Sequence, residues 1–372
     1  YIGIHSELFL MAENESELAG VMAHEIAHVT QRHLARRLER QQQISFPALA
    51  AMLGGLILAS ANPQAGIAAI SAAQAGAQQM IINHTRSNES EADRIGMQIL
   101  SEVELDPYGM ATFFEKMERS TRYMRLPPPV LLTHPMSQQR MADARLRAAE
   151  LRITPLKPST ALYLMQAKMR NLVERDVQEL AKLQNALDKK SPDDVITRYS
   201  RGLLRLRENN PKEARDLADG LLMAEPKNIS FLLLKTNALT ELKRVSEAEA
   251  ILAKELSVQP DHHALTIAYA DVLLLNGKAE LAREKLLAYV TLPDTEPNVY
   301  QMLARAQQAS GHINEVHESQ GLYLLSVGDL HGALSQFEVA VRSYSDDPHA
   351  TARINARIRF IQDILIEQKR RR

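Results

Sequence analysis

Apolar residues near the start of the chain recur at the spacing of one face of an α-helix. The positions that show this spacing of three or four residues are Leu18, Val21, Met22 and Ile26. Acidic and capping residues precede them between residues 12 and 18, as is typical of a helix N-terminus. The pattern therefore predicts a helix that begins in this segment and continues past Ile26.

Residues 41–83 contain no charged side chain and are rich in Ala, Leu, Ile and Gly. Asn62 and Pro63 divide this stretch, which predicts two helical arms joined in a hairpin. The uninterrupted apolar part, residues 46–61, is shorter than the roughly 20 residues that span a bilayer, and the second arm carries several glutamines. We therefore expect neither arm to cross a membrane.

The second half of the chain repeats with a period of 34 residues. Small residues recur at two positions of the period, Gly202, Thr236 and Ala270 in one series and Ala214, Ala248 and Ala282 in the other. This period is typical of tetratricopeptide repeats, whose paired helices need small residues where they cross. The register slips by half a repeat and resumes at Gly321, and a last helix from about residue 348 can cap the array.

These patterns predict a mainly α fold, in which a helical domain with a small β element precedes an α-solenoid. The first domain is expected over residues 1–151 and a proline-containing linker over 152–160. The repeats follow over 161–348, with a degenerate first unit, and the capping helix over 349–372. The chain begins inside a pattern that predicts a strand, so we expect an N-terminal segment to precede Tyr1.

Composition narrows the possible partners. The formal net charge is −1, and the repeats contain no tryptophan and few aromatic residues, so nucleic acid is not expected as a partner. Cysteine is absent, which excludes disulfides and thiolate metal sites.

The first predicted helix carries the sequence His24-Glu25-Ile26-Ala27-His28. Residues four apart lie one above the other on a helix, so His24 and His28 direct two imidazoles toward one point, with Glu25 beside them. This arrangement is typical of a zinc site with an adjacent general base. A zinc site usually takes three protein ligands. One common pattern places Gly three residues and a third His six residues after the second His, but those positions here are Gln31 and Leu34, which excludes that class; His33 is one residue out of register for it.

A second helical pattern over residues 88–96 offers carboxylates for that third position. Glu89 and Asp93 share one helix face, so one acid can complete the ligand set while the other accepts the free ring N–H of a ligand histidine. Glu91 points elsewhere and is the weaker candidate. Spacing alone does not choose between the two glutamates.

Three motifs in this order resemble the gluzincin metallopeptidase family of HtpX and the CAAX prenyl endopeptidase. They are the segment from His24 to His28, the segment from Glu89 to Asp93, and His134-Pro135 followed by Arg140. The repeat-containing tail makes the chain similar to a periplasmic branch of that family, linked to outer-membrane β-barrel assembly. The resemblance covers the whole chain, although its specific motifs all lie before Leu151.

The resemblance implies a zinc metalloendopeptidase that binds one Zn²⁺ per chain. It makes His24, His28 and Glu89 the zinc ligands, Glu25 the catalytic base and Asp93 a partner of a ligand histidine. His134 and Arg140 match the family's later positions, and either side chain could stabilise the negative charge of the tetrahedral intermediate. Three roles remain open for His134: a fourth ligand that keeps the enzyme latent, a transition-state donor, or a structural loop residue.

The same resemblance implies a periplasmic enzyme, peripheral at the outer membrane, that degrades misfolded or stalled outer-membrane β-barrel proteins. It also implies help with their assembly, with the repeats recruiting substrate or the β-barrel assembly machinery. The hairpin over 41–83 either packs into the peptidase core or near the active-site cleft, or presents a face to lipid or unfolded substrate. The alternative function is a chaperone or scaffold whose metal site stays latent.

Overall fold

The computed structural model describes residues 3–121, 134, 137–151, 160–290, 295–344 and 347–370. All regular elements within these ranges are α-helices, which confirms the mainly α prediction. The strand expected at the start of the chain is not formed by residues 3 and 4, and residues 1 and 2 lie outside the described part. A strand needs a partner strand for its backbone, whereas here helix α1 (Ser6–Met11) follows at once.

The chain divides into two compact units, residues 1–173 and 174–372. The predicted linker falls almost wholly on residues 152–159, outside the described part, so the domain boundaries stay predictions. Helix α8 (Thr160–Val173), expected in the first repeat, belongs to the N-terminal unit. There the Gln166 side-chain amide donates to the Phe9 and Ala12 carbonyls at 2.8 and 2.7 Å and holds α8 against α1.

The remaining helices of the N-terminal unit are α2 (Glu15–Thr30), α3 (His33–Ala61), α4 (Pro63–Glu102), α5 (Tyr108–Thr121) and α7 (Gln138–Glu150). Their core includes Met97, Leu100, Phe113 and Phe114, all of which are buried. Helix α2 starts where predicted, because the Asn14 side chain accepts from the Glu17 amide at 3.0 Å. Buried Glu17 pairs with Lys116 of α5 at 2.6 Å, which fixes α2 against α5.

Helices α2 and α4 cross at Gly96, and this close approach positions the candidate site. A Cβ atom on Gly96 would lie 3.1 Å from the backbone nitrogen of His24 and 2.7 Å from the Met110 methyl carbon. Glycine therefore allows α4 to approach the backbone of α2 at the motif histidine.

A tight turn joins α2 to α3. Arg32 adopts a left-handed conformation, with φ 54° and ψ 38°, and α3 begins at the next residue, His33. This turn places the His33 side chain beside the last turns of α2, where its ring contacts that of His28. The His33 ring is buried by this arrangement, at 3% exposure.

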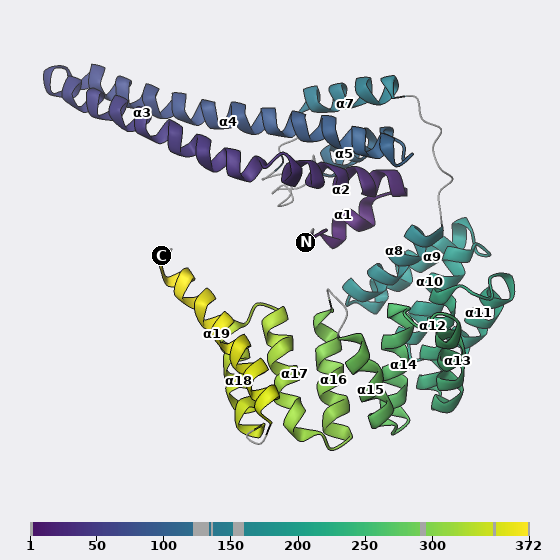
Figure 1. Cartoon of the computed structure of the whole chain (residues 1–372). Coiled ribbons are helices and arrows are strands. Elements are labelled where there is room, and N and C mark those ends of the chain that lie inside the picture. Colours follow the sequence, from purple (N-terminus) through teal and green to yellow (C-terminus); the bar gives the residue numbers. More distant parts are fainter. Residues whose placement is uncertain are drawn as a thin grey trace. The chain divides into compact units, whose positions relative to one another are not determined.

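The charge-free stretch forms the predicted hairpin, whose two arms are helix α3 and the first half of α4 (Figure 1). The arms pack closely, since a Cβ atom on Gly66 would lie 2.4 Å from the Ala59 Cα. Their outer surfaces remain open to solvent: Phe46, Leu53 and Ile57 are 78%, 55% and 74% exposed. The hairpin is therefore not buried in the peptidase core, which leaves an outward-facing apolar surface.

Helix α3 is long and apolar enough to cross a membrane by length and composition, with an 18-residue window of mean hydropathy 1.9 that is 11% buried. The expectation that neither arm is long enough was wrong for this arm. Its apolar window is 18 residues long, whereas the uninterrupted apolar part counted from the sequence covers only residues 46–61. One such helix by itself does not establish a membrane-spanning protein.

The C-terminal unit is a series of antiparallel helices that follow one another in chain order (Figure 1). They are α9 (Val177–Lys190), α10 (Val195–Arg207), α11 (Pro211–Ala224), α12 (Ile229–Glu241), α13 (Val245–Val258), α14 (His263–Leu275), α15 (Ala279–Tyr289), α16 (Pro297–Ala309), α17 (Ile313–Ser326), α18 (Leu330–Ser343) and α19 (Pro348–Arg370). The 34-residue period corresponds to one helix pair, as predicted for tetratricopeptide repeats.

The small residues of the repeat lie where helices cross. A Cβ atom on Gly202 of α10 would lie 2.6 Å from the Leu234 side chain of α12, and Ala214, Ala248 and Ala282 are fully buried. Gly321 of α17 approaches the next helix instead, since a Cβ atom there would lie 2.6 Å from the ring of Phe337 in α18. Helix α19 follows as the predicted last helix.

Candidate metal centre

Four side chains from α2, α4 and the segment before α7 place their donor atoms together. His24 and His28 lie one turn apart on α2, with their Nε2 atoms 3.0 Å apart. Glu89 of α4 places one carboxylate oxygen 3.4 Å from the His24 nitrogen and the other 3.4 Å from the His28 nitrogen. His134 adds its Nδ1, at 3.2 Å from both Glu89 oxygens and 3.4 Å from the His24 Nε2.

This donor set fits a divalent metal ion with tetrahedral coordination. Ligand atoms about 2.0–2.2 Å from a tetrahedral zinc ion lie about 3.3–3.6 Å from one another. The separations between His24 and His28, between Glu89 and the three histidines, and between His24 and His134 run from 3.0 to 3.4 Å, and all four donor atoms lie within 4.8 Å of one another. Three imidazoles and a carboxylate, with no thiolate, are ligands that zinc and similar ions accept.

Burial and neighbouring charges shift the pKa values of the cluster residues. Burial alone would lower the pKa of His24, but hydrogen bonds to Asp93 and Glu89 outweigh burial and raise that pKa to about 9. Burial and the charge on His24 lower the pKa of His28 to about 4. Burial would raise the pKa of Glu89, but hydrogen bonds from His134 and His24 keep it below its ordinary value. Without a metal, His24 is therefore the imidazole of the cluster that holds an additional proton.

Asp93 lies where the sequence predicted, one turn beyond Glu89 on α4. Its Oδ1 is 2.8 Å from the His24 Nδ1, the ring nitrogen that faces away from the cluster. An acceptor at this position keeps the proton on Nδ1 and leaves Nε2 free to act as a ligand. The Asp93 carboxylate is 5% exposed, and hydrogen bonds from His24 and Arg140 outweigh its burial and lower its pKa.

Arg140 lies on α7 with a guanidinium that is almost completely buried. It donates to both Asp93 oxygens at 2.8 and 2.7 Å, and it lies 2.9 Å from a Glu89 oxygen. The face of its guanidinium lies over the Phe114 ring, 5.1 Å from the ring centroid. The guanidinium is therefore engaged by two acids of the cluster, and it holds both α4 carboxylates in place.

His33 is a further member of the site that sequence reasoning had set aside. Its Nδ1 lies 2.8 Å from the His28 Nδ1, and its Nε2 lies 3.3 Å from a carboxylate oxygen of Glu91. The sequence excluded His33 as a metal ligand because of its spacing, and Glu91 was expected to point elsewhere. Both side chains lie outside the donor cluster, but His33 contacts His28, and Glu91 contacts His33.

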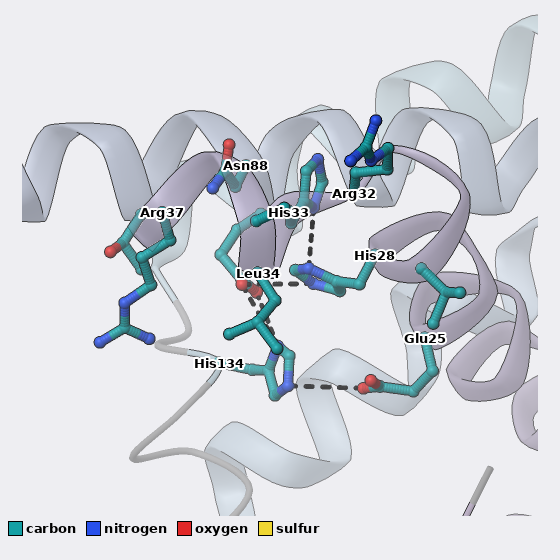
Figure 2. Close-up of a pocket in the computed structure, with 12 residues that line it drawn as sticks. Glu25, His28, Arg32, His33, Leu34, Arg37, Asn88 and His134 are labelled. Atoms are coloured by element: carbon teal, nitrogen blue, oxygen red, sulfur yellow. Dashed lines mark hydrogen bonds and ion pairs between the residues drawn. The ribbon is translucent and has the colours of Figure 1, made fainter. Parts of the chain in front are cut away.

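A cleft of about 530 Å³ opens beside the donor cluster. Figure 2 shows Glu25, His28, His33 and His134 among the side chains that line it. The His134 Nε2 lies 3.5 Å from the Glu25 carboxylate while its Nδ1 faces the other donors. Glu25 therefore borders the cleft, through which a substrate would approach the cluster.

Comparison with known proteins agrees with this geometry. Residues 1–148 match the model for peptidase family M48. The beta-barrel assembly-enhancing protease of Escherichia coli (strain K12) is 36% identical over 361 residues, which cover 95% of this chain and 73% of that protein. This chain belongs to the family of beta-barrel assembly-enhancing proteases. It is therefore a metalloprotease of the M48 type with a repeat-containing C-terminal unit.

Other similar proteins match all of this chain or a part of it. A putative beta-barrel assembly-enhancing protease of Vibrio cholerae is 37% identical over 374 residues, covering all of this chain and 76% of that protein. A protease HtpX homolog of Paraburkholderia phytofirmans is 35% identical over 146 residues, 34% of this chain and 45% of its own. Among solved structures, a tetratricopeptide repeat protein from Parabacteroides merdae matches 74% of this chain and 92% of its own, at a TM-score of 0.38 and 15% identity.

Proposed function

We propose that this chain is a zinc-dependent endopeptidase whose metal ligands are His24, His28 and Glu89. The observation that carries the proposal is the convergence of three imidazoles and a carboxylate within 4.8 Å, next to the carboxylate of Glu25. Zinc bound by this set supplies a Lewis acid to the scissile carbonyl. The proposal rests on the same residues that carry the resemblance to the gluzincin family.

Glu25 is proposed as the general base. Its carboxylate borders the cleft and is 32% exposed, so a water molecule between it and a bound peptide can be reached. Glu25 takes the proton from that water as the water attacks the carbonyl, and then gives it to the leaving amine nitrogen. The carboxylate oxygen thus carries one proton between the two steps and returns to its ionised form.

Arg140 is proposed as a positioning residue rather than the donor to the tetrahedral intermediate. Its guanidinium is 7% exposed and engaged by Asp93 and Glu89. A donor to the intermediate must reach substrate in the cleft, and a buried side chain held by two acids does not. Of the two alternatives that the sequence left open, His134 is the one that borders the cleft.

We propose that His134 holds the enzyme in a latent state. A catalytic metal site keeps one coordination position open for water or substrate. Here the His134 Nδ1 faces the other three donors, and its Nε2 faces Glu25 at 3.5 Å. In this position His134 fills the fourth ligand site and also contacts the Glu25 carboxylate. Peptide hydrolysis therefore requires His134 to move away.

The proposed substrates are misfolded or stalled outer-membrane β-barrel proteins in the periplasm. Support comes from the name of the Escherichia coli relative, which describes a protease that enhances β-barrel assembly. Assistance in assembly, and recruitment of substrate or of the β-barrel assembly machinery by the repeats, belong to the same proposal. A helical solenoid of this type offers an extended surface for protein partners.

The hairpin is proposed to make peripheral contact with a membrane. It combines the exposed apolar surface of α3 with Arg32, Arg37 and Arg40 near its base, which suits a bilayer with anionic headgroups. Flotation with anionic vesicles tests this: Phe46→Ser with Leu53→Ser should reduce co-flotation. Equal co-flotation of that variant and the wild type would remove the proposal.

The function is tested by degradation of an unfolded β-barrel protein, with bound zinc measured in each preparation. Glu25→Gln is expected to lose cleavage and keep its zinc, because the base is lost and the ligands are not. His134→Ala is expected to cleave faster than the wild type, because the fourth position is then open. Slower cleavage would contradict latency and would instead make His134 a donor to the transition state. Cleavage by Glu25→Gln at the wild-type rate would contradict the proposal.

The alternative of a chaperone or scaffold with a latent metal site makes the opposite prediction for cells. A scaffold works without hydrolysis, so Glu25→Gln would support β-barrel assembly as well as the wild type does. An outright loss of cellular function in Glu25→Gln would exclude the scaffold as the sole role.

A further inference from the structure

The two histidines of α2 are held by different partners on the side that faces away from the metal position. The His24 Nδ1 meets a carboxylate directly, that of Asp93, at 2.8 Å. The His28 Nδ1 instead meets another imidazole, that of His33, at 2.8 Å. The dashed line between the two rings is visible in Figure 2. His33 is 3% exposed, so water does not compete for this contact.

Hydrogen positions follow from the number of protons that neutral imidazoles carry. When His28 acts as a ligand through Nε2, its one ring proton is on Nδ1, and this N–H donates to the His33 Nδ1. The His33 Nδ1 is then an acceptor, so the proton of that ring is on Nε2. This second N–H points to a Glu91 carboxylate oxygen, 3.3 Å away.

Glu91 is in turn held by a cation. The Arg36 guanidinium lies 2.5 Å from the same Glu91 oxygen and 3.1 Å from the Asn88 side-chain oxygen. The same Glu91 oxygen thus accepts from both neighbours, His33 and Arg36. In this series of hydrogen bonds, His28 donates to His33 and His33 donates to Glu91, so no two N–H groups face each other.

We infer that His33 and Glu91 form a relay that sets the ring orientation and tautomer of His28 as a metal ligand. The inference rests on the proposed zinc site and adds positioning residues to it. His33 does for His28 what Asp93 does for His24, with an imidazole between the ligand and the carboxylate. Arg36 fixes Glu91 as Arg140 fixes Asp93.

The backbone explains how a residue five positions after His28 reaches its ring. On a continuous helix, residues five apart lie on different faces. The left-handed Arg32 ends α2 and starts α3, and this turn brings His33 back to His28. Glu91 arrives from α4, two residues after the ligand Glu89.

Two substitutions of His33 separate the relay from a merely structural role. The side-chain amide of asparagine lies near the position of an imidazole Nδ1, and that of glutamine near the position of Nε2. His33→Asn therefore keeps an acceptor for His28, whereas His33→Gln keeps only the contact with Glu91. His33→Ala removes both contacts, and His84→Ala, on α4 with its ring 3.5 Å from Asn88, is the matched control.

The measurement is the zinc dissociation constant of the full chain, from competition with a chromophoric chelator at fixed pH, beside the melting temperature of each metal-free variant. His33→Ala and His33→Gln are expected to raise the dissociation constant about 10–100-fold. His33→Asn is expected to raise it less, because this variant keeps an acceptor for His28 but loses the contact with Glu91. His84→Ala is expected to remain near the wild-type value. Glu91→Gln should give an intermediate increase, because its amide oxygen still accepts from His33 without the charge.

Equal dissociation constants in all His33 variants, with only the metal-free melting temperature lowered, would overturn the relay and leave His33 as a packing residue. Equal weakening by His33→Asn and His33→Gln would also overturn it, because the acceptor for His28 would then not matter. A wild-type chain that binds no zinc would overturn the proposed function itself, which is a distinct result from tight wild-type binding without any effect of His33.

Discussion

At the scale of single residues, the buried ion pair between Arg140 and Asp93 decides how firmly the site is held. The guanidinium makes two contacts with Asp93, at 2.8 and 2.7 Å, and a third with Glu89. Removing one partner of a buried pair leaves a charge without compensation, which costs about 3–5 kcal/mol. Arg140→Ala is therefore expected to lower the free energy of unfolding by about that amount and to weaken metal binding, as measured by denaturant unfolding and zinc titration.

The matched control lies on the same helix. Arg145 pairs with Glu115 through a side chain that is 63% exposed, so Arg145→Ala should cost about 0–1 kcal/mol and leave the metal affinity unchanged. Arg140→Lys should not restore the site, because a single ammonium group cannot reproduce the paired donors of a guanidinium. Equal effects of Arg140→Ala and Arg145→Ala would contradict the positioning role of Arg140.

The site could be predicted from the sequence only where helical spacing carries the information. His24 and His28 are four residues apart, and Glu89 and Asp93 are four apart, so the shared helix face of each pair follows from helix geometry. The choice of Glu89 over Glu91 needed the family resemblance. His33 was missed because its contact with His28 depends on the left-handed turn at Arg32, and nothing in the residue spacing indicates that turn.

At the scale of elements, the crossing of α2 and α4 sets the distance between the histidines and Glu89. An alanine methyl at position 96 would lie 3.1 Å from the His24 backbone nitrogen, which is closer than ordinary van der Waals contact. Gly96→Ala is therefore expected to push the helices apart, to destabilise the chain by about 1–3 kcal/mol and to lower the peptidase activity. Denaturant unfolding and a peptide cleavage assay measure the two effects.

Gly76 lies on the same helix α4 and has no atom within 4 Å of the Cβ position. Gly76→Ala should stabilise the chain by up to about 1 kcal/mol, because alanine is the better helix former, and should leave activity unchanged. If the two substitutions had the same effect, helix propensity and not the crossing would explain Gly96.

The hairpin shows which features of an element a sequence can supply. Its two arms and the division at Asn62 were predicted from the charge-free stretch and the proline. The arms are longer than that stretch, because α3 begins at His33 and α4 continues without a break through Glu89 to Glu102. Residues 88–96 were predicted to begin a second helix, but they lie inside α4, which begins at Pro63.

At the scale of the whole molecule, the two units divide the proposed work between hydrolysis and recognition. The proposed ligands and base all lie in residues 1–173, and the repeats lie mainly in 174–372. The repeat period was readable from small residues, because close helix crossings exclude larger side chains. Helix α8 was assigned to the repeats from sequence but packs on α1, a contact made by Gln166 that no period indicates.

A chain that ends after α8 tests this division. Because the N-terminal unit has its own core, the shortened chain is expected to bind zinc and to cleave a short peptide at the rate of the full chain. It is expected to degrade an unfolded β-barrel protein more slowly, because the proposed recruiting surface is gone. Equal rates on the protein substrate, measured side by side, would remove the recruiting role of the repeats.

The central claim is that a metal ion held by His24, His28 and Glu89 carries out peptide hydrolysis. The most direct measurement is to remove the metal with a chelator and to follow cleavage of an unfolded β-barrel protein as zinc is returned. The wild-type and His134→Ala chains are both used, since His134 covers the fourth position. Cleavage should be absent without metal and should rise until one zinc is bound per chain. Cleavage by the metal-free chains, or none by either chain with one zinc bound, would contradict the account.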